Sequence, residues 1–296
     1  MLIVDYSQLA IAGLMQFQDN LKRSSPDQSV DLIRHVVLSS LLSNKRKFAK
    51  EYGDVIIASD SRKYWRKSVF PFYKAHRAAD REKSDLDWKL IFDTLSSIRD
   101  DLREHFPYKV IEVEGAEADD IIGVLAKWSQ ENELKQVGIL EEPQPVLILS
   151  SDQDNFQCHQ FKNVKQFAPM HKKFVKPTNA KQALIDKICT GDRGDGIPNI
   201  MSADNSIVEG IRQKPFPKKR LEEFYANGID ACKNEVEKRN FQRNQQIVSY
   251  EFIPDELRQS IIDTYKTTTP KGSKKTIYQY LVKNRCKNLL MDIEDF

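Results

Sequence analysis

Three short apolar runs, each ending at an aspartate, constrain the fold of this chain most. They span residues 2–5, 55–60 and 146–152 and end at Asp5, Asp60 and Asp152. Segments with the apolar spacing of amphipathic helices lie between them, at 30–48, 86–106 and 118–128, and a fourth apolar run covers 110–113. Strands that alternate with helices indicate a parallel sheet. We therefore expect an α/β fold with a twisted, mainly parallel sheet flanked by helices.

Acidic residues stand at the predicted carboxyl ends of these strands. In open parallel sheets this edge gathers binding and catalytic groups, because loops and helix N-termini converge there. A fourth acidic cluster, AEADD at 116–120, opens the helix that follows the run at 110–113. One aspartate after a strand is commonly a helix cap. Four acidic groups in register along one edge predict a site.

The chemistry of carboxylates narrows the nature of that site. Carboxylate oxygens without Cys or His partners select hard cations, so we expect Mg²⁺, with Mn²⁺ able to substitute, rather than zinc or copper. Without cations, so many carboxylates would repel one another. Two ions about 3.5–4 Å apart can activate a water and stabilise the leaving oxygen of an in-line displacement. Helical spacing puts Glu117 and Asp120 on one face with Asp119 offset, and Asp152 and Asp154 can point across a turn toward one centre.

Net charge alone says little about partners, since 46 basic against 43 acidic residues leave +3. The distribution of charge is more informative. Residues 61–83 hold eight basic and two acidic side chains, 162–181 hold six basic and no acidic ones, and 212–220 hold five basic and no acidic ones. Basic stretches around an acidic centre suit a phosphate polymer together with its metal ions, although a charge run is more commonly a solvated face.

Aromatic and basic residues alternate in the first basic stretch. Single-stranded nucleic acid is held by such sets, with cations on its backbone and rings under its bases. Rings at helical spacing are also typical of a hydrophobic core, so both interpretations stay open for Phe70 and Phe72. The predicted contacts here are Arg62, Lys63, Tyr64, Trp65, Arg66, Lys67 and Tyr73. In the second stretch, Lys172, Lys173 and Lys176 are predicted to follow a duplex backbone.

Cysteine usage and the N-terminus bear on location. The four cysteines form no CxxC pair and no zinc-binding spacing with histidine, which favours a reducing compartment. The opening MLIVDYSQLA lacks the basic segment and cleavage site of a signal peptide, and no run reads as a membrane span. We expect a cytoplasmic protein and a monomer.

An ordered set of motifs carries a family resemblance. VDYSQLA, IIASDSRKYWR, FYKAHR, AEADD, ILSSDQDNF, FAPMHKKFVK and TGDRGDGIPNI follow one another up to residue 198, across about two-thirds of the chain. In this order they resemble the flap endonuclease family of structure-specific 5′ nucleases, and within it the ribonucleases H of T-even phages. The resemblance implies a PIN-like 5′ nuclease fold, a helical arch at about 61–85 and a helix–three-turn–helix element that grips duplex.

The resemblance also implies residue roles. A first metal site would use Asp5, Asp60, Glu117, Asp119 and Asp152, a second would use Asp154, Asp192 and Asp195, and Asp120 would complete the cluster. Lys74 and Arg77, three apart on a helix at the base of the arch, would face the scissile phosphate and stabilise its developing charge. The implied activity is a metal-dependent 5′→3′ exonuclease and flap endonuclease with ribonuclease H activity. It would act on RNA·DNA or DNA duplexes, flaps and forks, and would remove lagging-strand primers in phage DNA replication.

Beyond residue 178 the pattern predicts helices only, at 180–189, 218–226, 235–250 and 256–265. We expect an α/β catalytic domain at 1–178 and a helical domain with the duplex-binding element at 179–296. Many family members follow their GDxxDxIP motif with a glycine-rich turn, but this chain has NIMSADNSIVEGIRQK there. The duplex contacts in this region are therefore expected from Lys214, Lys218, Lys219 and Arg220.

Two questions stay open in the sequence. The tail MDIEDF, at 291–296, is either a packed or frayed terminus or a segment that docks a single-strand-binding protein or a sliding clamp. The function is either nuclease activity or, as the main alternative, non-catalytic binding of branched nucleic acid on the same fold. A small-molecule phosphatase is disfavoured, because a small substrate would not need the basic stretches.

Overall fold

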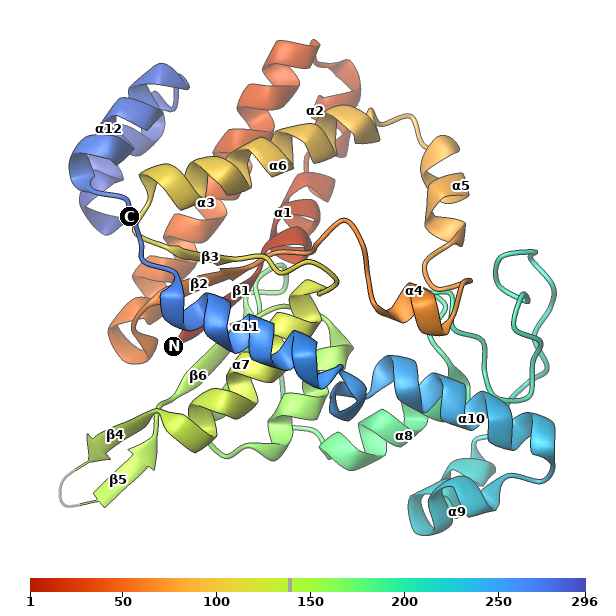
Figure 1. Ribbon diagram of the computed structural model, residues 1–296. Coiled ribbons are helices and arrows are strands. Elements are labelled where there is room, and N and C mark those ends of the chain that lie inside the picture. Colours follow the sequence, from red (N-terminus) through yellow and green to blue (C-terminus); the bar gives the residue numbers. More distant parts are fainter. Residues whose placement is uncertain (138–139) are drawn as a thin grey trace.

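A six-stranded sheet forms the centre of the computed structural model, which describes residues 1–137 and 140–296. The strand order is β3-β2-β1-β6-β7-β8, and all neighbours are parallel except β7 and β8 (Figure 1). The expected α/β fold with a mainly parallel sheet is confirmed. The strands are β1 Leu2–Asp5, β2 Val55–Ala58, β3 Lys109–Ile111, β6 Val146–Leu149, β7 Val164–Ala168 and β8 Lys173–Phe174.

The central strands β1, β2 and β6 match the predicted apolar runs. These runs are apolar because helices cover both faces of the sheet, and every residue of the three strands is buried. Strand β7 was not predicted, because Lys165 and Gln166 interrupt its apolar pattern. Gln166 is nevertheless buried, and its amide donates to the carbonyls of Ser150 and Asp152 at 2.8 Å each. A separate antiparallel hairpin, β4 Leu134–Val137 with β5 Leu140–Pro143, was also not predicted.

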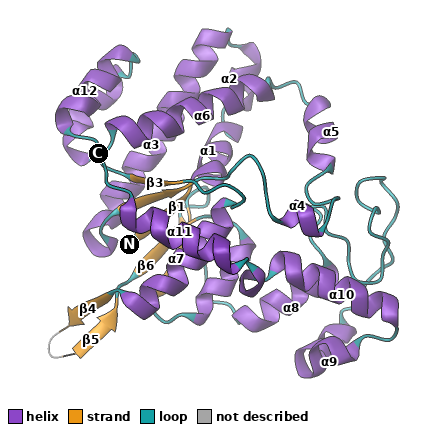
Figure 2. Ribbon diagram, in the orientation of Figure 1, coloured by secondary structure: helices purple, strands orange, loops and turns teal. Residues whose placement is uncertain are grey.

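Two helical layers enclose the sheet (Figure 2). On one side a hydrophobic cluster joins the sheet to α1, α3 and α6, and on the other side a second cluster joins it to α7 and α11. The predicted helices at 30–48, 86–106 and 118–128 correspond to α3, α6 and α7. Helix α3 starts earlier, because Ser25 is its N-cap and forms a capping box with Gln28, and Pro26 is its first residue. The helices up to α7 are α1 Tyr6–Met15, α2 Gln18–Arg23, α3 Pro26–Tyr52, α4 Arg66–Val69, α5 His76–Glu82, α6 Trp88–His105 and α7 Ala118–Asn132.

The second half of the chain beyond β8 is helical, as predicted. Its α-helices are α8 Ala180–Thr190, α9 Lys219–Asn227, α10 Glu235–Val248, α11 Asp255–Thr267 and α12 Lys274–Lys283, and its 3₁₀ helices are η2 Gly228–Ala231, η3 Tyr250–Phe252 and η4 Lys287–Asp295. A further 3₁₀ helix, η1 Gln153–Gln160, lies between β6 and β7. Helices α8, α9 and α10 share a small core of their own around Ile188, Phe224 and Phe241. Helix α12 was not predicted. The division at residue 178 stays a prediction.

Residues after α10 return to the α/β layers. Helix α11 packs on α7, whereas α12 and η4 join the cluster of α3 and α6. Phe296 is buried, with its ring centroid 5.3 Å from that of Phe106, and Arg46 pairs with Asp292 and Asp295 at 2.5 Å each. Met291, in contrast, is 91% exposed. The tail therefore packs against the fold through its last residue while it presents Met291 to solvent.

The predicted arch segment leaves the sheet after β2 and returns to it through α6, by way of α4, a run of turns and α5 (Figure 1). In the described ranges, no helix is both long and apolar enough to cross a membrane.

Candidate active site

Carboxylates gather where β1, β2 and β6 end. Asp5 is the last residue of β1 and pairs with Ala58 of β2, Asp60 follows two residues later, and Asp152 follows β6. The Asp5 carboxylate is buried close to Asp60 and Asp152; burial and then the Asp60 charge raise the pKa of Asp5 to about 7. The register of three parallel strands thus brings together side chains that are far apart in sequence.

Asp119 and Asp154 complete this cluster. Burial raises the pKa of Asp119 well above its usual range, and the charges of Asp152 and Asp5 raise it further. Burial also raises the pKa of Asp154 to about 7, although the Lys187 ammonium opposes the shift. The charge interactions among Asp5, Asp60, Asp119, Asp152 and Asp154 show that these carboxylates lie near one another at this edge of the sheet.

Neutral groups orient these carboxylates. The Ser150 hydroxyl donates to Asp5 Oδ2 at 3.1 Å, and the Asn155 amide donates to Asp119 Oδ1 at 3.4 Å. The backbone N–H of Ala118, at the start of α7, donates to Asp60 Oδ1 at 2.9 Å. Sequence reasoning missed Ser150 and Asn155, even though both lie inside the ILSSDQDNF motif.

Lys187 of α8 connects the second predicted set of carboxylates. Its ammonium pairs with Asp154 and, at 2.7 Å, with Asp192. Burial alone would lower the pKa of Lys187, but Asp154 and Asp192 raise it above its ordinary value. The sequence analysis did not select Lys187. The available signal was its position one helical turn before the GDRGD motif.

Lys74 and Arg77 meet at Asp195. Lys74 Nζ lies 2.6 Å from Glu117 Oε1 and 3.5 Å from Asp195 Oδ1, and Arg77 Nη2 donates to Asp195 Oδ1 at 2.8 Å. Burial works against the charge on Lys74, but these carboxylates raise its pKa above the ordinary value. The prediction that both cations sit on one helix is wrong, because Lys74 precedes α5 with a left-handed φ of 54°. Both cations nevertheless reach the same carboxylate.

Backbone contacts hold the base of the arch against the DRGDG turn. The Lys74 N–H donates to the Asp195 carbonyl at 2.8 Å, and Arg77 Nε donates to the Gly194 carbonyl at 3.0 Å. Gly196 has φ +74°, and a Cβ there would lie 2.9 Å from the Phe72 carbonyl. Only glycine suits both that conformation and that close approach. The turn therefore places Lys74 and Arg77 beside the carboxylates.

Three of the predicted site residues, Arg66, Tyr73 and Asp120, lie instead in a buried network of ion pairs and hydrogen bonds. Arg66 is 4% exposed and donates to Glu117 Oε2 at 2.8 Å and to Asp120 Oδ1 at 2.7 Å. Asp120 also accepts from the Trp65 indole at 3.2 Å, and the Tyr73 hydroxyl donates to Glu117 at 3.0 Å. Arg66 and Tyr73 are thus unavailable to nucleic acid, contrary to prediction. Asp120 is turned toward Arg66 and away from the cluster.

The other predicted nucleic-acid contacts are spread over the surface. Arg220 is a further correction, because it is buried in an ion pair with Glu237 at 2.8 Å. Tyr64 and Trp65 are half-buried. Their contacts with nucleic acid stay predictions, as do those of the exposed residues Arg62, Lys63, Lys67, Lys172, Lys173, Lys176, Lys214, Lys218 and Lys219.

The donor set fits hard divalent cations. It consists of carboxylate oxygens, and burial together with the charges of neighbouring carboxylates raises the pKa of Asp5, Asp119 and Asp154. In the part of the chain that the structure describes, no three Asp, Glu, His or Cys side chains form a ready-made ligand set. Lys74 and Lys187 instead bridge pairs of the carboxylates. A cation here would take over charge compensation that the two ammonium groups now provide.

Comparison with known proteins identifies the family. Residues 1–188 match a family described as 5′–3′ exonuclease, N-terminal resolvase-like domain, and residues 179–296 match T4 RNase H, C terminal. Ribonuclease H of Enterobacteria phage T4 is 31% identical over 309 residues, which cover 99% of this chain and 95% of that protein.

Solved structures show the same fold. The flap endonuclease of bacteriophage T5, in a pseudo-enzyme-product complex with DNA and metal ions, superposes with a TM-score of 0.60 and 17% identity over 90% of this chain and 99% of that chain. The T5 5′-exonuclease with bound zinc ions gives 0.59 and 15% over 90% and 98%. The predicted resemblance is confirmed: the chain belongs to the 5′–3′ exonuclease family and is a metal-dependent 5′ nuclease.

Proposed function

We propose that this nuclease hydrolyses phosphodiester bonds from the 5′ end of RNA·DNA and DNA duplexes, flaps and forks, and that it removes lagging-strand RNA primers in phage DNA replication. The observation that carries the proposal is the carboxylate cluster around Asp5, Asp119 and Asp152, with the cations of Lys74 and Arg77 at its rim. The ribonuclease H of phage T4 supports the choice of RNA·DNA by its name. Action in the host cytoplasm, as a monomer, goes with this role.

We propose two Mg²⁺ ions, for which Mn²⁺ substitutes. Bound there, they would lower the pKa of a water and polarise the phosphate. The structure supports two sets of ligands, because Asp152 faces both Asp5 and Asp154. The first set is Asp5, Asp60, Glu117, Asp119 and Asp152, and the second is Asp154, Asp192 and Asp195. Asp120 is better explained as the partner of Arg66.

Lys74 and Arg77 are proposed to stabilise charge on the scissile phosphate. Both are now paired with Asp195, and Lys74 also with Glu117. A divalent cation on these carboxylates would compete with the pairing and free the ammonium for a phosphate oxygen. Fixed donors that face developing charge account for about 10²–10³ in rate.

Release of 5′ fragments from a labelled RNA·DNA hybrid, measured with and without Mg²⁺, tests this function. We expect short 5′ products with Mg²⁺ and none with EDTA, and no products from the Asp152→Asn variant in either buffer. A matched DNA duplex and a 5′-flap substrate measure the balance of activities. Binding of the hybrid without Mg²⁺-dependent cleavage would instead support the non-catalytic module.

We further propose that a single-strand-binding protein or sliding clamp docks on the C-terminal region. Deletion of residues 291–296 is a poor test, because it would remove Phe296 from the core. Met291→Ser leaves the core intact, since the side chain is exposed. We expect this variant to cleave a free duplex normally and to lose stimulation by the partner. Equal stimulation of variant and wild type would exclude Met291 from the docking surface.

A further inference from the structure

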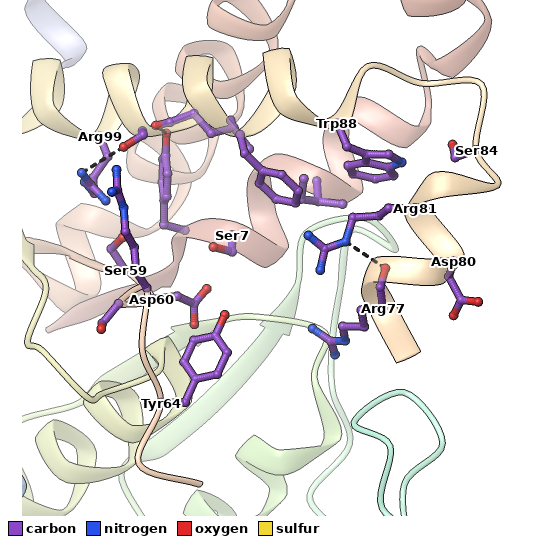
Figure 3. A pocket seen from close by; sticks show the side chains of 17 residues that line it. Ser7, Ser59, Asp60, Tyr64, Arg77, Asp80, Arg81, Ser84, Trp88 and Arg99 are labelled. Atoms are coloured by element: carbon purple, nitrogen blue, oxygen red, sulfur yellow. Dashed lines mark hydrogen bonds between the residues drawn. The ribbon is translucent and has the colours of Figure 1, made fainter. Parts of the chain in front are cut away.

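A cavity of about 700 Å³ opens beside the carboxylate cluster, between α1, the residues after β2, α5 and the start of α6. Figure 3 shows Asp60 and Tyr64 at one side of it and Trp88 with Arg81 at the other. The volume lies in the range of small-ligand sites. Of its lining residues the proposed cleavage step uses Asp60 and Arg77, which leaves the wall formed by α6 without a role in that step.

Two stacked rings form the apolar wall of the cavity. Trp88 and Phe92, one turn apart on α6, have ring centroids 5.6 Å apart and planes 27° apart. Phe92 is 41% exposed, and the Arg81 guanidinium lies 5.2 Å from its ring centroid. A large exposed ring in the wall of a cavity is costly unless a ligand covers it.

Cations surround these rings on the side of the arch. Arg81 and Arg77 both line the cavity, and Arg81 Nε donates to the Arg77 carbonyl at 3.1 Å, which directs the side chain along the wall (Figure 3). Arg62 lines the cavity next to Asp60. Aromatic faces combined with guanidinium groups hold single-stranded nucleic acid, because every base presents a π-face and every linkage a negative charge.

We propose that this cavity is a nucleobase site in which a base of the 5′ single-stranded segment stacks on Trp88 and Phe92. The inference rests on the proposed 5′ nuclease function and extends it to a part of the substrate that is not cleaved at that moment. A strand whose phosphate reaches the cluster at Asp60 would bring a neighbouring nucleotide to the cavity mouth. The stacking rings are thus Trp88 and Phe92 of α6, not the buried Phe70 and Tyr73.

The primary test measures binding without cleavage. An oligothymidine and an oligomer of abasic units of equal length are titrated into the full chain in EDTA, with tryptophan fluorescence as the signal. We expect quenching by the oligothymidine, none by the abasic oligomer, and loss of the quenching in Trp88→Phe but not in Trp128→Phe. Trp88→Ala and Phe92→Ala should each bind oligothymidine about tenfold more weakly. Equal quenching by the two oligomers, or unchanged quenching in Trp88→Phe, would overturn the proposal.

The second test uses cleavage and separates this proposal from the nuclease function. With Mg²⁺, Phe92→Ala should weaken binding of a 5′-flap substrate about tenfold relative to a blunt duplex, and the difference should vanish for an abasic flap. Equal losses on blunt and flapped substrates, together with a lower Tm, would make the rings structural and overturn the site. If wild type cleaves none of these substrates, the nuclease function fails, whereas the EDTA titration still decides on the cavity.

Discussion

Asp119 and Asp120 are adjacent in the sequence at the start of α7, yet they belong to two different regions. Asp119 faces Asp5, Asp152 and Asp154, where like charges and burial raise its pKa. Asp120 faces Arg66, which donates to both of its oxygens at 2.7 and 2.9 Å. In the first region like charges repel one another, and a cation can relieve that repulsion. In the second region the charge of Asp120 is neutralised by Arg66. Two adjacent aspartates at the same edge of the sheet thus have different surroundings: Asp119 belongs to the carboxylate cluster, and Asp120 belongs to the buried ion-pair network beside it.

The largest expected effect is the loss of cleavage when a carboxylate of the first region is replaced. Asp119→Asn should abolish Mg²⁺-dependent cleavage, because it removes a proposed ligand charge without a change of shape. The same variant should keep or gain thermal stability in EDTA, since it removes a charge from a repulsive cluster. Cleavage rates and Tm values of wild type and variant check both parts. Near-normal cleavage would remove Asp119 from the metal site.

Lys74 lies where the two regions meet, and its loss should be the next largest effect. Lys74→Ala should slow the chemical step by about 10²–10³, because its proposed partner is charge that develops on the phosphate. Single-turnover rates at saturating enzyme measure this step, and a binding titration in Ca²⁺ measures affinity. Normal rates with weakened binding would instead make Lys74 a positioning residue.

Substitutions in the buried network of Arg66, Glu117 and Asp120 should mainly lower the free energy of unfolding. Asp120→Asn removes one of the two charged partners of the buried Arg66, and breaking a buried ion pair costs about 3–5 kcal/mol of unfolding free energy. Urea denaturation measures this loss, and Asp119→Asn is the matched control. Below its unfolding transition the Asp120→Asn protein should retain Mg²⁺-dependent cleavage. Full stability with complete loss of cleavage would show that Asp120 is a ligand after all.

The smallest effect concerns pH. Asp5 and Asp154 have a pKa of about 7 in the folded protein against 3.8 ordinarily, so the folded state binds protons that the unfolded chain does not. The unfolding free energy in EDTA should therefore rise as pH falls from about 7 toward 4. Saturating Mg²⁺ should flatten this dependence, as should Asp5→Asn in part. A metal-free protein that loses stability over the same interval would contradict the repulsive cluster.

The strands and most of the carboxylate cluster were predictable for a local reason. Apolar runs such as Val55–Ala58 have one stable environment, the interior of a sheet covered on both faces, and their ends define the edge where Asp5, Asp60 and Asp152 meet. The hairpin β4–β5 and β7 were not predictable in this way. Their sequences are polar, and Gln166 is buried only because carbonyls of another loop accept its hydrogen bonds.

By itself, then, the sequence determined the parallel sheet, the family and the acidic edge, because hydrophobic periodicity and ordered motifs are local properties. Only the tertiary structure decided which charges are paired. It paired Asp120 with Arg66 in a buried network, placed Lys187 between Asp154 and Asp192, and left Phe92 exposed while it buried Tyr73. The reason is physical: burial and ion pairing depend on which side chains approach from other elements, and the sequence spacing around one residue does not specify those neighbours.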